Sequence, residues 1–126
     1  MSEARSKARG QTSDYFVVYD RVEGDLLGRV RNLTTEGTML IVDEAIEVSR
    51  VFECRMTLPD IIEGRREFYF DIECRWCQMN KEACWHEAGF RFVNSTEQGR
   101  KIIDRLVNEW MKLEESSDVN QFGLYG

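Results

Sequence analysis

Hydrophobic and polar residues alternate along the chain between residues 14 and 93. This two-residue period is typical of β-strands, whose successive side chains point to opposite faces, and it is clearest at 68–76. Pro59 is expected to end the fourth strand, because proline cannot donate a ladder hydrogen bond. The pattern predicts six strands, at Tyr15–Tyr19, Leu26–Leu33, Thr38–Val42, Phe52–Leu58, Phe68–Trp76 and Trp85–Val93. Short strands with regular turns favour a closed or nearly closed barrel, which leaves no exposed sheet edge.

Beyond residue 93 the apolar period changes to that of an α-helix. One apolar stripe has helical spacing, and it consists of Ile102, Ile103, Leu106, Val107, Trp110 and Leu113. Ser95 or Thr96 can serve as the N-cap, and Ser95-x-x-Gln98 fits a capping box. We expect this helix to close one mouth of the barrel or to lie along its flank. The polar residues 116–126 are expected to form a mobile tail.

Size and composition limit the class of protein. A chain of 126 residues, 42% hydrophobic and 32% charged, has room for one globular domain with its own core and not for two. It contains no apolar run near the roughly 20 residues of a membrane helix. Residues 1–10 lack the apolar segment of a secretory signal. We therefore expect a cytoplasmic protein that does not insert into a membrane, with its cysteines as free thiols.

The charge distribution separates two classes of anionic partner. The net charge of −6 argues against DNA or RNA, whose binding depends on neutralising many phosphates. Arg5, Lys7 and Arg9 nevertheless concentrate positive charge in one segment of an acidic chain, which suits a small anion. On charge alone, a solvated tail is the more frequent explanation of such a segment.

Two short motifs are more informative together than apart. Arg5-x-x-x-Arg9 precedes the first predicted strand, and Asn32-x-Thr34-x-x-Gly37 joins the second strand to the third. Chance alone supplies about one Arg-x-x-x-Arg match in a chain of this composition. The second motif also suits a plain β-turn whose polar side chains bind the local backbone. The order, the spacing and the surrounding strands make the pair much more specific than either half.

The pair of motifs resembles the PilZ family, bacterial receptors for the second messenger cyclic di-GMP. The motifs of that family are Arg-x-x-x-Arg and Asp/Asn-x-Ser-x-x-Gly, so the chain departs only at Thr34. The resemblance extends from about Arg5 to about Leu113. It implies a mainly β fold, a six-stranded antiparallel barrel of the split-barrel type with a C-terminal α-helix. The implied organisation is a flexible N-terminal arm at 1–12, a PilZ barrel with its helix at 13–115 and a mobile tail at 116–126.

The resemblance also implies roles for the motif residues. Arg5 and Arg9 would contact phosphate and guanine, because a guanidinium binds phosphate in bidentate fashion or the Hoogsteen edge of guanine. Asn32 would offer its amide to a guanine edge. Thr34 keeps the hydroxyl of the usual serine but adds a methyl group, so we expect binding that is retained and weaker. Gly37 would permit a positive φ or a close approach of the ligand.

Trp76 and Ala4 bear on the same ligand. Trp76 resembles the aromatic residue of some family members and is a base-stacking candidate. Its parity also places it with Phe68, Phe70 and Ile72 on the barrel-facing side, so core packing remains an equal interpretation. Some relatives carry an additional arginine just before the first motif, and Ala4 at that place favours one bound nucleotide over two.

The function implied is that of a single-domain receptor or adaptor. Binding would order the N-terminal arm, and the ordered arm would present a new surface to an unidentified effector protein. The affected process could be motility, biofilm formation, exopolysaccharide synthesis or type IV pili. We expect no enzyme, cofactor or metal, and a monomer or weak dimer. The alternative is a PilZ-like interaction module that binds no nucleotide, although such members typically lack the arginine motif.

A zinc site is the less favoured alternative. Cys74-x-x-Cys77, Cys84 and His86 could supply three thiolates and one imidazole. Cys74 and Cys77 have opposite parity, so they would point to opposite faces of a regular strand, and no glycine or proline forms a turn between them. Cysteine as a small core hydrophobe is the simpler interpretation.

Overall fold

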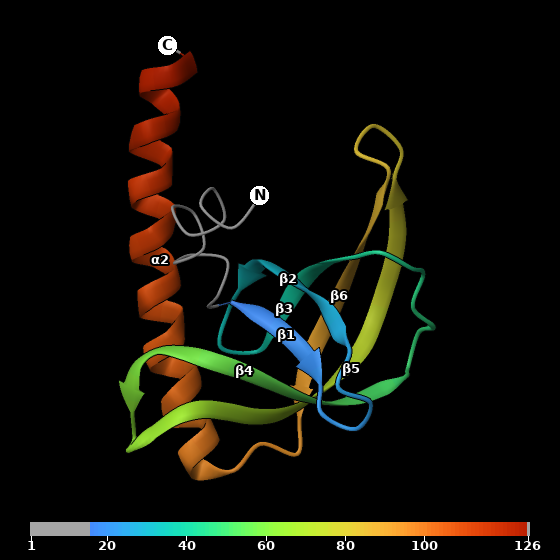
Figure 1. The fold of residues 1–126 in the computed structure, drawn as a ribbon, viewed down its shortest axis with the longest axis vertical. Helices are drawn as coiled ribbons and strands as arrows, with labels where there is room; N and C mark the ends of the chain where they lie inside the picture. Colours follow the sequence, from blue (N-terminus) through green and yellow to red (C-terminus); the bar gives the residue numbers. More distant parts are fainter. Residues whose placement is uncertain (1–15, 126) are drawn as a thin grey trace, which may run out of the picture.

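The described residues fold into a closed six-stranded barrel followed by a C-terminal helix. The computed structural model describes residues 16–125, and their side chains as far as residue 114. Every neighbouring pair of strands is antiparallel, in the order β1-β2-β3-β6-β5-β4 (Figure 1). The elements are β1 (Val17–Asp20), β2 (Leu26–Leu33), β3 (Gly37–Val42), β4 (Val51–Ile62), β5 (Arg65–Asn80), β6 (Trp85–Val93) and α2 (Glu97–Tyr125). The predicted antiparallel barrel with a C-terminal helix is confirmed.

The predicted end of the fourth strand at Pro59 is wrong. Strand β4 continues to Ile62, and its pairing with β5 is irregular between Thr57 and Ile62. Pro59 lies within that irregular stretch, where the ladder is interrupted, so its missing N–H removes no regular pair. Strands β2 and β6 have the predicted bounds, whereas β5 is longer than predicted at both ends.

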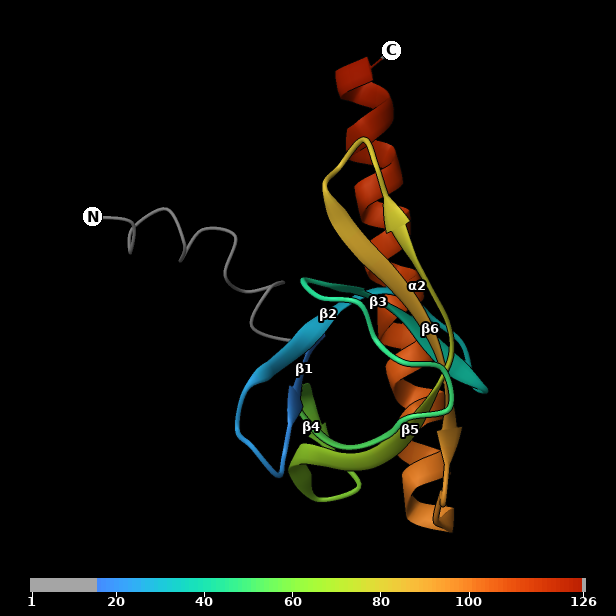
Figure 2. The same ribbon diagram turned by 90° about the vertical axis from the view of Figure 1, so that its right-hand side faces the viewer.

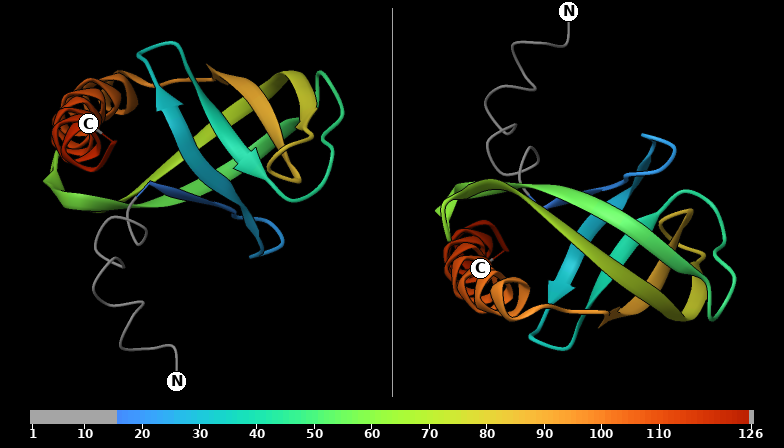
Figure 3. Two further views of the ribbon diagram at one scale, coloured as in Figure 1. Left: turned by 90° about the horizontal axis from the view of Figure 1, so that it is seen from above. Right: turned by 90° about the horizontal axis from the view of Figure 1, so that it is seen from below.

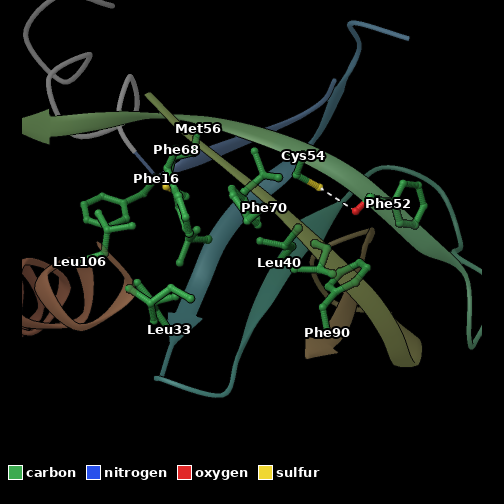
Figure 4. Packing of buried hydrophobic residues seen from close by; sticks show 14 of the residues in the cluster. Phe16, Leu33, Leu40, Phe52, Cys54, Met56, Phe68, Phe70, Phe90 and Leu106 are labelled. Carbon is green, nitrogen blue, oxygen red and sulfur yellow. Dashed lines mark hydrogen bonds between the residues drawn. The ribbon is translucent and has the colours of Figure 1, made fainter. Parts of the chain in front are cut away.

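The inward side chains of all six strands form one hydrophobic core. Val18, Leu40 and Ile72 are completely buried. Leu40 and Ile72 alternate with half-buried neighbours along their strands. Aromatic rings fill the interior, with Phe68 stacked on Phe70 at 4.7 Å between ring centroids. In Figure 4 this cluster extends from Phe52 and Phe90 at one end to Phe16 and Leu106 at the other. The two-residue period seen in the sequence is therefore the alternation between core and solvent.

Helix α2 closes one end of the barrel. Ile102, Ile103 and Leu106 are at most 3% exposed and belong to the same core as the strands. Figure 2 looks into the barrel with α2 behind it, and Figure 3 shows the helix end-on beside one barrel end. The later turns run past the barrel (Figure 1). Within the described residues, no helix is long and apolar enough to cross a membrane.

The segment predicted as a tail belongs to this helix. The backbone of α2 continues to Tyr125, so residues 116–125 are helical in the structure. Their side chains lie outside the described residues. The predicted mobility of this segment stays a prediction.

Replacing Thr96 by alanine is expected to lower the free energy of unfolding by about 1 kcal/mol, because it removes the N-cap of α2. The Thr96 hydroxyl accepts the backbone N–H of Gly99 at 2.9 Å, so Thr96 and not Ser95 is the cap. Urea unfolding measures the effect. Ser95→Ala is the matched control and should change stability by a few tenths of a kcal/mol at most. Equal losses in the two variants would contradict this assignment.

Candidate functional site

The turn between β2 and β3 is organised by the hydroxyl of Thr34. Its oxygen accepts the backbone N–H groups of Glu36 and Gly37, each at 3.2 Å, and the hydroxyl lies 3.3 Å from the Gly37 carbonyl. The Thr34 N–H donates to that same carbonyl at 2.9 Å. The Asn-x-Thr-x-x-Gly motif is therefore a hydrogen-bonded turn, as the plain β-turn interpretation requires. The same turn is compatible with ligand binding, because its hydrogen bonds fix the backbone of the motif at the edge of a surface depression.

Thr34→Val should lower the free energy of unfolding by about 1–2 kcal/mol. Valine has nearly the shape of threonine but lacks the oxygen, so two turn N–H groups lose their acceptor. Chemical denaturation with Thr34→Ser as the control separates the oxygen from the methyl group. Serine keeps the oxygen and should stay within about 0.5 kcal/mol of the natural protein. An equal loss for serine and valine would show that the hydroxyl does not hold the turn.

Gly37 is required for the approach of two strands. It does not adopt a positive φ, so one reason expected from the sequence for its presence is wrong. A Cβ at this position would collide with the carbonyl oxygen of Phe90 and would press on the Cα of Arg91. Both atoms belong to the backbone of β6, which pairs with β3 here. The missing side chain allows β3 and β6 to pair at the edge of the site.

A bulge in β5 turns Trp76 to the outer face. Cys74 pairs with Phe90 and Trp76 pairs with Gly89, so Arg75 is an extra residue. A bulge of this kind shifts the parity of all residues that follow it. Trp76 is 39% exposed, and the interpretation that placed it in the core is wrong. Its indole lies directly on Gly89, at the position that a Cβ would occupy.

A second bulge, in β2, changes the orientation of Asn32, the first residue of the Asn-x-Thr-x-x-Gly motif. Val30 pairs with Leu40 and Asn32 pairs with Met39, which leaves Arg31 as the extra residue. Arg31 and Asn32 are consequently both exposed. The side-chain oxygen of Asn32 accepts the N–H of Leu33 at 2.9 Å, which directs its NH₂ group elsewhere. The two bulges bring an amide from β2 and an indole from β5 to the same outer face.

The outer face between these bulges forms a shallow depression of about 350 Å³. Two cross-strand rows contribute to it. In one row Gly37 pairs with Arg91. In the other row Gly89 pairs with Met39 on one side and with Trp76 on the other. Each row contains a glycine, and the missing side chain deepens the depression at that position. The lining residues are Asn32, Thr34, Glu36, Gly37, Thr38, Met39, Arg75, Trp76, Gly89, Phe90 and Arg91.

The depression contains two arginines that belong to neither sequence motif. Arg75 and Arg91 line it, with side chains 55% and 58% exposed. The carboxylate of Glu73 lies 2.9 Å from Nε of Arg91 and 3.8 Å from Nη1 of Arg75. Glu36 adds an acidic residue to the lining. The sequence shows that Arg75 is adjacent to Trp76. The alternation of hydrophobic and polar residues, however, gives no reason to place Arg91 on this surface.

The arrangement suits a flat, anionic ligand. An indole face can stack on a purine, two guanidinium groups can bind phosphate or a base edge, and the Asn32 amide can read a base. The structure brings together four of the six residues predicted for the site, namely Asn32, Thr34, Gly37 and Trp76. Arg5 and Arg9 lie outside the described residues.

The cysteines do not assemble a metal site. The β5 bulge overturns the expected opposite orientation of Cys74 and Cys77, because Cys74 is completely buried and Cys77 packs against the same core. Cys84 is exposed, and no group of three or more potential ligands gathers among the described side chains. Burial raises the pKa of the Cys74 thiol above its ordinary value, and burial together with Asp20 and Asp71 raises that of Cys54 to about 12. Such thiols are poor sources of thiolate.

Comparisons with known proteins agree on one family. The family model described as PilZ domain matches residues 3–109. Among solved structures, the PilZ domain of YcgR from Escherichia coli with c-di-GMP has a TM-score of 0.58 at 16% identity, covering 82% of this chain and 87% of that chain. The structure of YcgR from Escherichia coli in complex with c-di-GMP also has a TM-score of 0.58, at 15% identity. It covers 86% of this chain, which spans 45% of that longer one. No curated protein matches the sequence.

Proposed function

This chain belongs to the PilZ domain family, and from that premise we propose that it is a receptor for cyclic di-GMP, not an enzyme. The observation that carries the proposal is the depression in which Asn32, Thr34 and Gly37 lie beside Trp76. The motif residues that the family associates with the nucleotide thus line the same surface as a base-stacking candidate. The likeness to two structures that contain c-di-GMP supports the same ligand.

The chemistry of the depression matches the chemistry of cyclic di-GMP. The ligand has two phosphates and two guanines, so a receptor needs cationic donors and flat surfaces together. Trp76 would stack on one guanine, and Asn32 would bind a base edge with its NH₂ group. Arg5 and Arg9 would then close over the nucleotide from the N-terminal segment and bind phosphate and a guanine Hoogsteen edge.

Ordering of the N-terminal arm is the proposed output. The described chain begins at Phe16, which is buried and packs edge-on against Trp110 of α2 with ring centroids 5.1 Å apart. The segment that carries Arg5 and Arg9 therefore continues from a residue fixed in the core. Binding of both arginines to one nucleotide would order that segment and create a surface for an effector protein.

Trp76→Ala should weaken cyclic di-GMP binding by about tenfold or more. Stacking of a base on an aromatic side chain contributes about 1–3 kcal/mol when it is tested by alanine substitution. Fluorescence anisotropy with a labelled nucleotide gives the dissociation constants. Trp85→Ala is the matched control, since Trp85 has similar exposure, 37% against 39%, but does not line the depression. Equal effects of the two substitutions would remove Trp76 from the proposed site.

Isothermal titration of cyclic di-GMP into the full chain tests the proposed function, with cyclic di-AMP as the matched control ligand. The two nucleotides share the sugar–phosphate ring and differ in the bases. The proposal predicts saturable binding of cyclic di-GMP, with a ratio near one nucleotide per chain, and much weaker binding of cyclic di-AMP. No heat and no thermal stabilisation with cyclic di-GMP would leave the nucleotide-free interaction module as the better hypothesis.

A further inference from the structure

Glu73 occupies an unusual position beside the depression. It follows Arg91 in the row Gly37–Arg91–Glu73, and it points to the same outer face as the ligand-facing residues. Its side chain is only 17% exposed, whereas Arg75 and Arg91 are 55% and 58% exposed. Glu73 does not line the depression itself. A carboxylate half-hidden behind two exposed arginines is placed to act on them and not on a ligand.

The contact with Arg91 fixes one edge of its guanidinium. Nε donates to the Glu73 carboxylate at 2.9 Å, in good hydrogen-bonding geometry. A guanidinium has five N–H donors in a rigid plane, so the hydrogens on its two terminal nitrogens remain for another acceptor. Arg75 lies farther away, with Nη1 at 3.8 Å from the same oxygen, and it is held less tightly. Arg91 is thus the better oriented of the two cations.

We propose that Glu73 is a positioning residue that holds Arg91 over the depression as a third arginine of the nucleotide site. This inference rests on the proposed function. A free arginine must lose rotamer freedom when it binds a ligand, and an arginine already held by Glu73 loses less. The terminal nitrogens of Arg91 then point to a phosphate or a guanine edge beside Trp76. Glu73 makes no contact with the ligand in this arrangement.

The charge of Glu73 and its positioning of Arg91 should have opposite effects on nucleotide affinity. A carboxylate beside two arginines lowers the positive potential of the site, so its removal would strengthen anion binding if charge alone decided the outcome. If position decides the outcome, removal weakens binding because Arg91 becomes free. Glutamine separates the two effects, since Glu73→Gln removes the charge and keeps an oxygen that can accept the Nε–H.

Titrations of cyclic di-GMP into the full-length protein and its variants test the proposal. Glu73→Ala is expected to weaken binding about tenfold, and Glu73→Gln is expected to restore it to within about threefold of the natural protein. Glu53→Ala is the matched control, because Glu53 also forms an ion pair on the outer face, with Arg21 at 3.7 Å, away from the depression. That variant should bind as the natural protein does, and all variants should keep their thermal unfolding midpoints.

A double-mutant cycle decides whether Glu73 acts through Arg91. If it does, Glu73→Ala adds no further loss once Arg91 is alanine. Additive losses, or an alanine variant of Glu73 that binds as tightly as the natural protein or more tightly, would overturn the positioning role and leave the receptor function intact. Failure of the natural protein to bind cyclic di-GMP would overturn both proposals, so the two failures are distinguishable.

Discussion

Replacing Arg5 and Arg9 together by alanine is expected to weaken cyclic di-GMP binding by at least about 100-fold. Hydrogen bonds to charged groups contribute about 1.5–3 kcal/mol each, so the loss of two such residues removes about 3 kcal/mol or more. Each 1.4 kcal/mol corresponds to a factor of ten in the dissociation constant. Isothermal titration with the double variant measures the loss. The free energy of unfolding should not change, because both substitutions lie before the core-forming barrel residues in the sequence.

A second double variant controls for net charge. Arg100→Ala with Lys101→Ala removes two positive charges from exposed positions on α2, which do not line the depression. Binding should fall by no more than about twofold, because these exposed charges do not contact the ligand and salt screens their effect on it. Similar losses in both double variants would reduce the role of Arg5 and Arg9 to general electrostatics.

Gly37→Ala is expected to lower the free energy of unfolding by about 3 kcal/mol or more. The added methyl group would collide with the Phe90 carbonyl oxygen, and this obstacle is backbone that cannot rotate away. Relief of the clash requires β3 to move from β6, at the cost of ladder pairing in a closed barrel. The expected loss therefore lies at the upper end of what overpacking normally causes. Guanidinium unfolding followed by circular dichroism measures it.

Gly24→Ala is the matched comparison, because Gly24 is constrained by its backbone conformation and not by close packing. Gly24 has a φ of +82° and open space around its Cβ position, so alanine there costs only backbone strain, about 1 kcal/mol. A loss for Gly37→Ala no larger than that of Gly24→Ala would show that β3 and β6 can separate at little cost. The close approach at Gly37 would then be no constraint on the site.

The barrel was predictable because its core follows a simple rule. In four of the six predicted strand segments, inward residues such as Leu40, Phe52 and Phe70 alternate with exposed or half-buried ones over most of their length. The change to helical spacing after residue 93 likewise coincides with α2, whose Ile102 and Leu106 are buried in the barrel end. Burial of one face of each element imposes both periods, so both are visible in the sequence.

The candidate site was only partly predictable, because it depends on departures from that rule. The alternation continued through Trp76 assigns the indole to the core, and only the extra residue Arg75 turns it outward. A bulge adds one residue without changing the composition of the strand, so the residues of β5 themselves do not mark it. Gly89 in the last strand was the one available signal, since a strand glycine often marks the close approach of another group.

The contribution of Arg91 depends on cross-strand register. Arg91 becomes part of the site because it pairs with Gly37 on one side and with Glu73 on the other. Glu73 and Arg91 are 18 positions apart in the chain, and Gly37 is farther still. Periodicity within a strand gives the face of a residue but not its neighbour across the ladder. The motifs therefore indicated the ligand class, whereas the two arginines that line the depression could be identified only from the structure.

The indole NMR signals of the three tryptophans can show where on the protein cyclic di-GMP binds. A ¹H–¹⁵N spectrum of the full chain is recorded during titration with cyclic di-GMP, and the Trp76 signal is assigned from a Trp76→Phe variant. We predict a large, saturable shift of the Trp76 indole and little change of the Trp85 indole. Saturable binding that leaves the Trp76 signal unmoved would contradict the proposed site, because the nucleotide would then bind elsewhere on the protein.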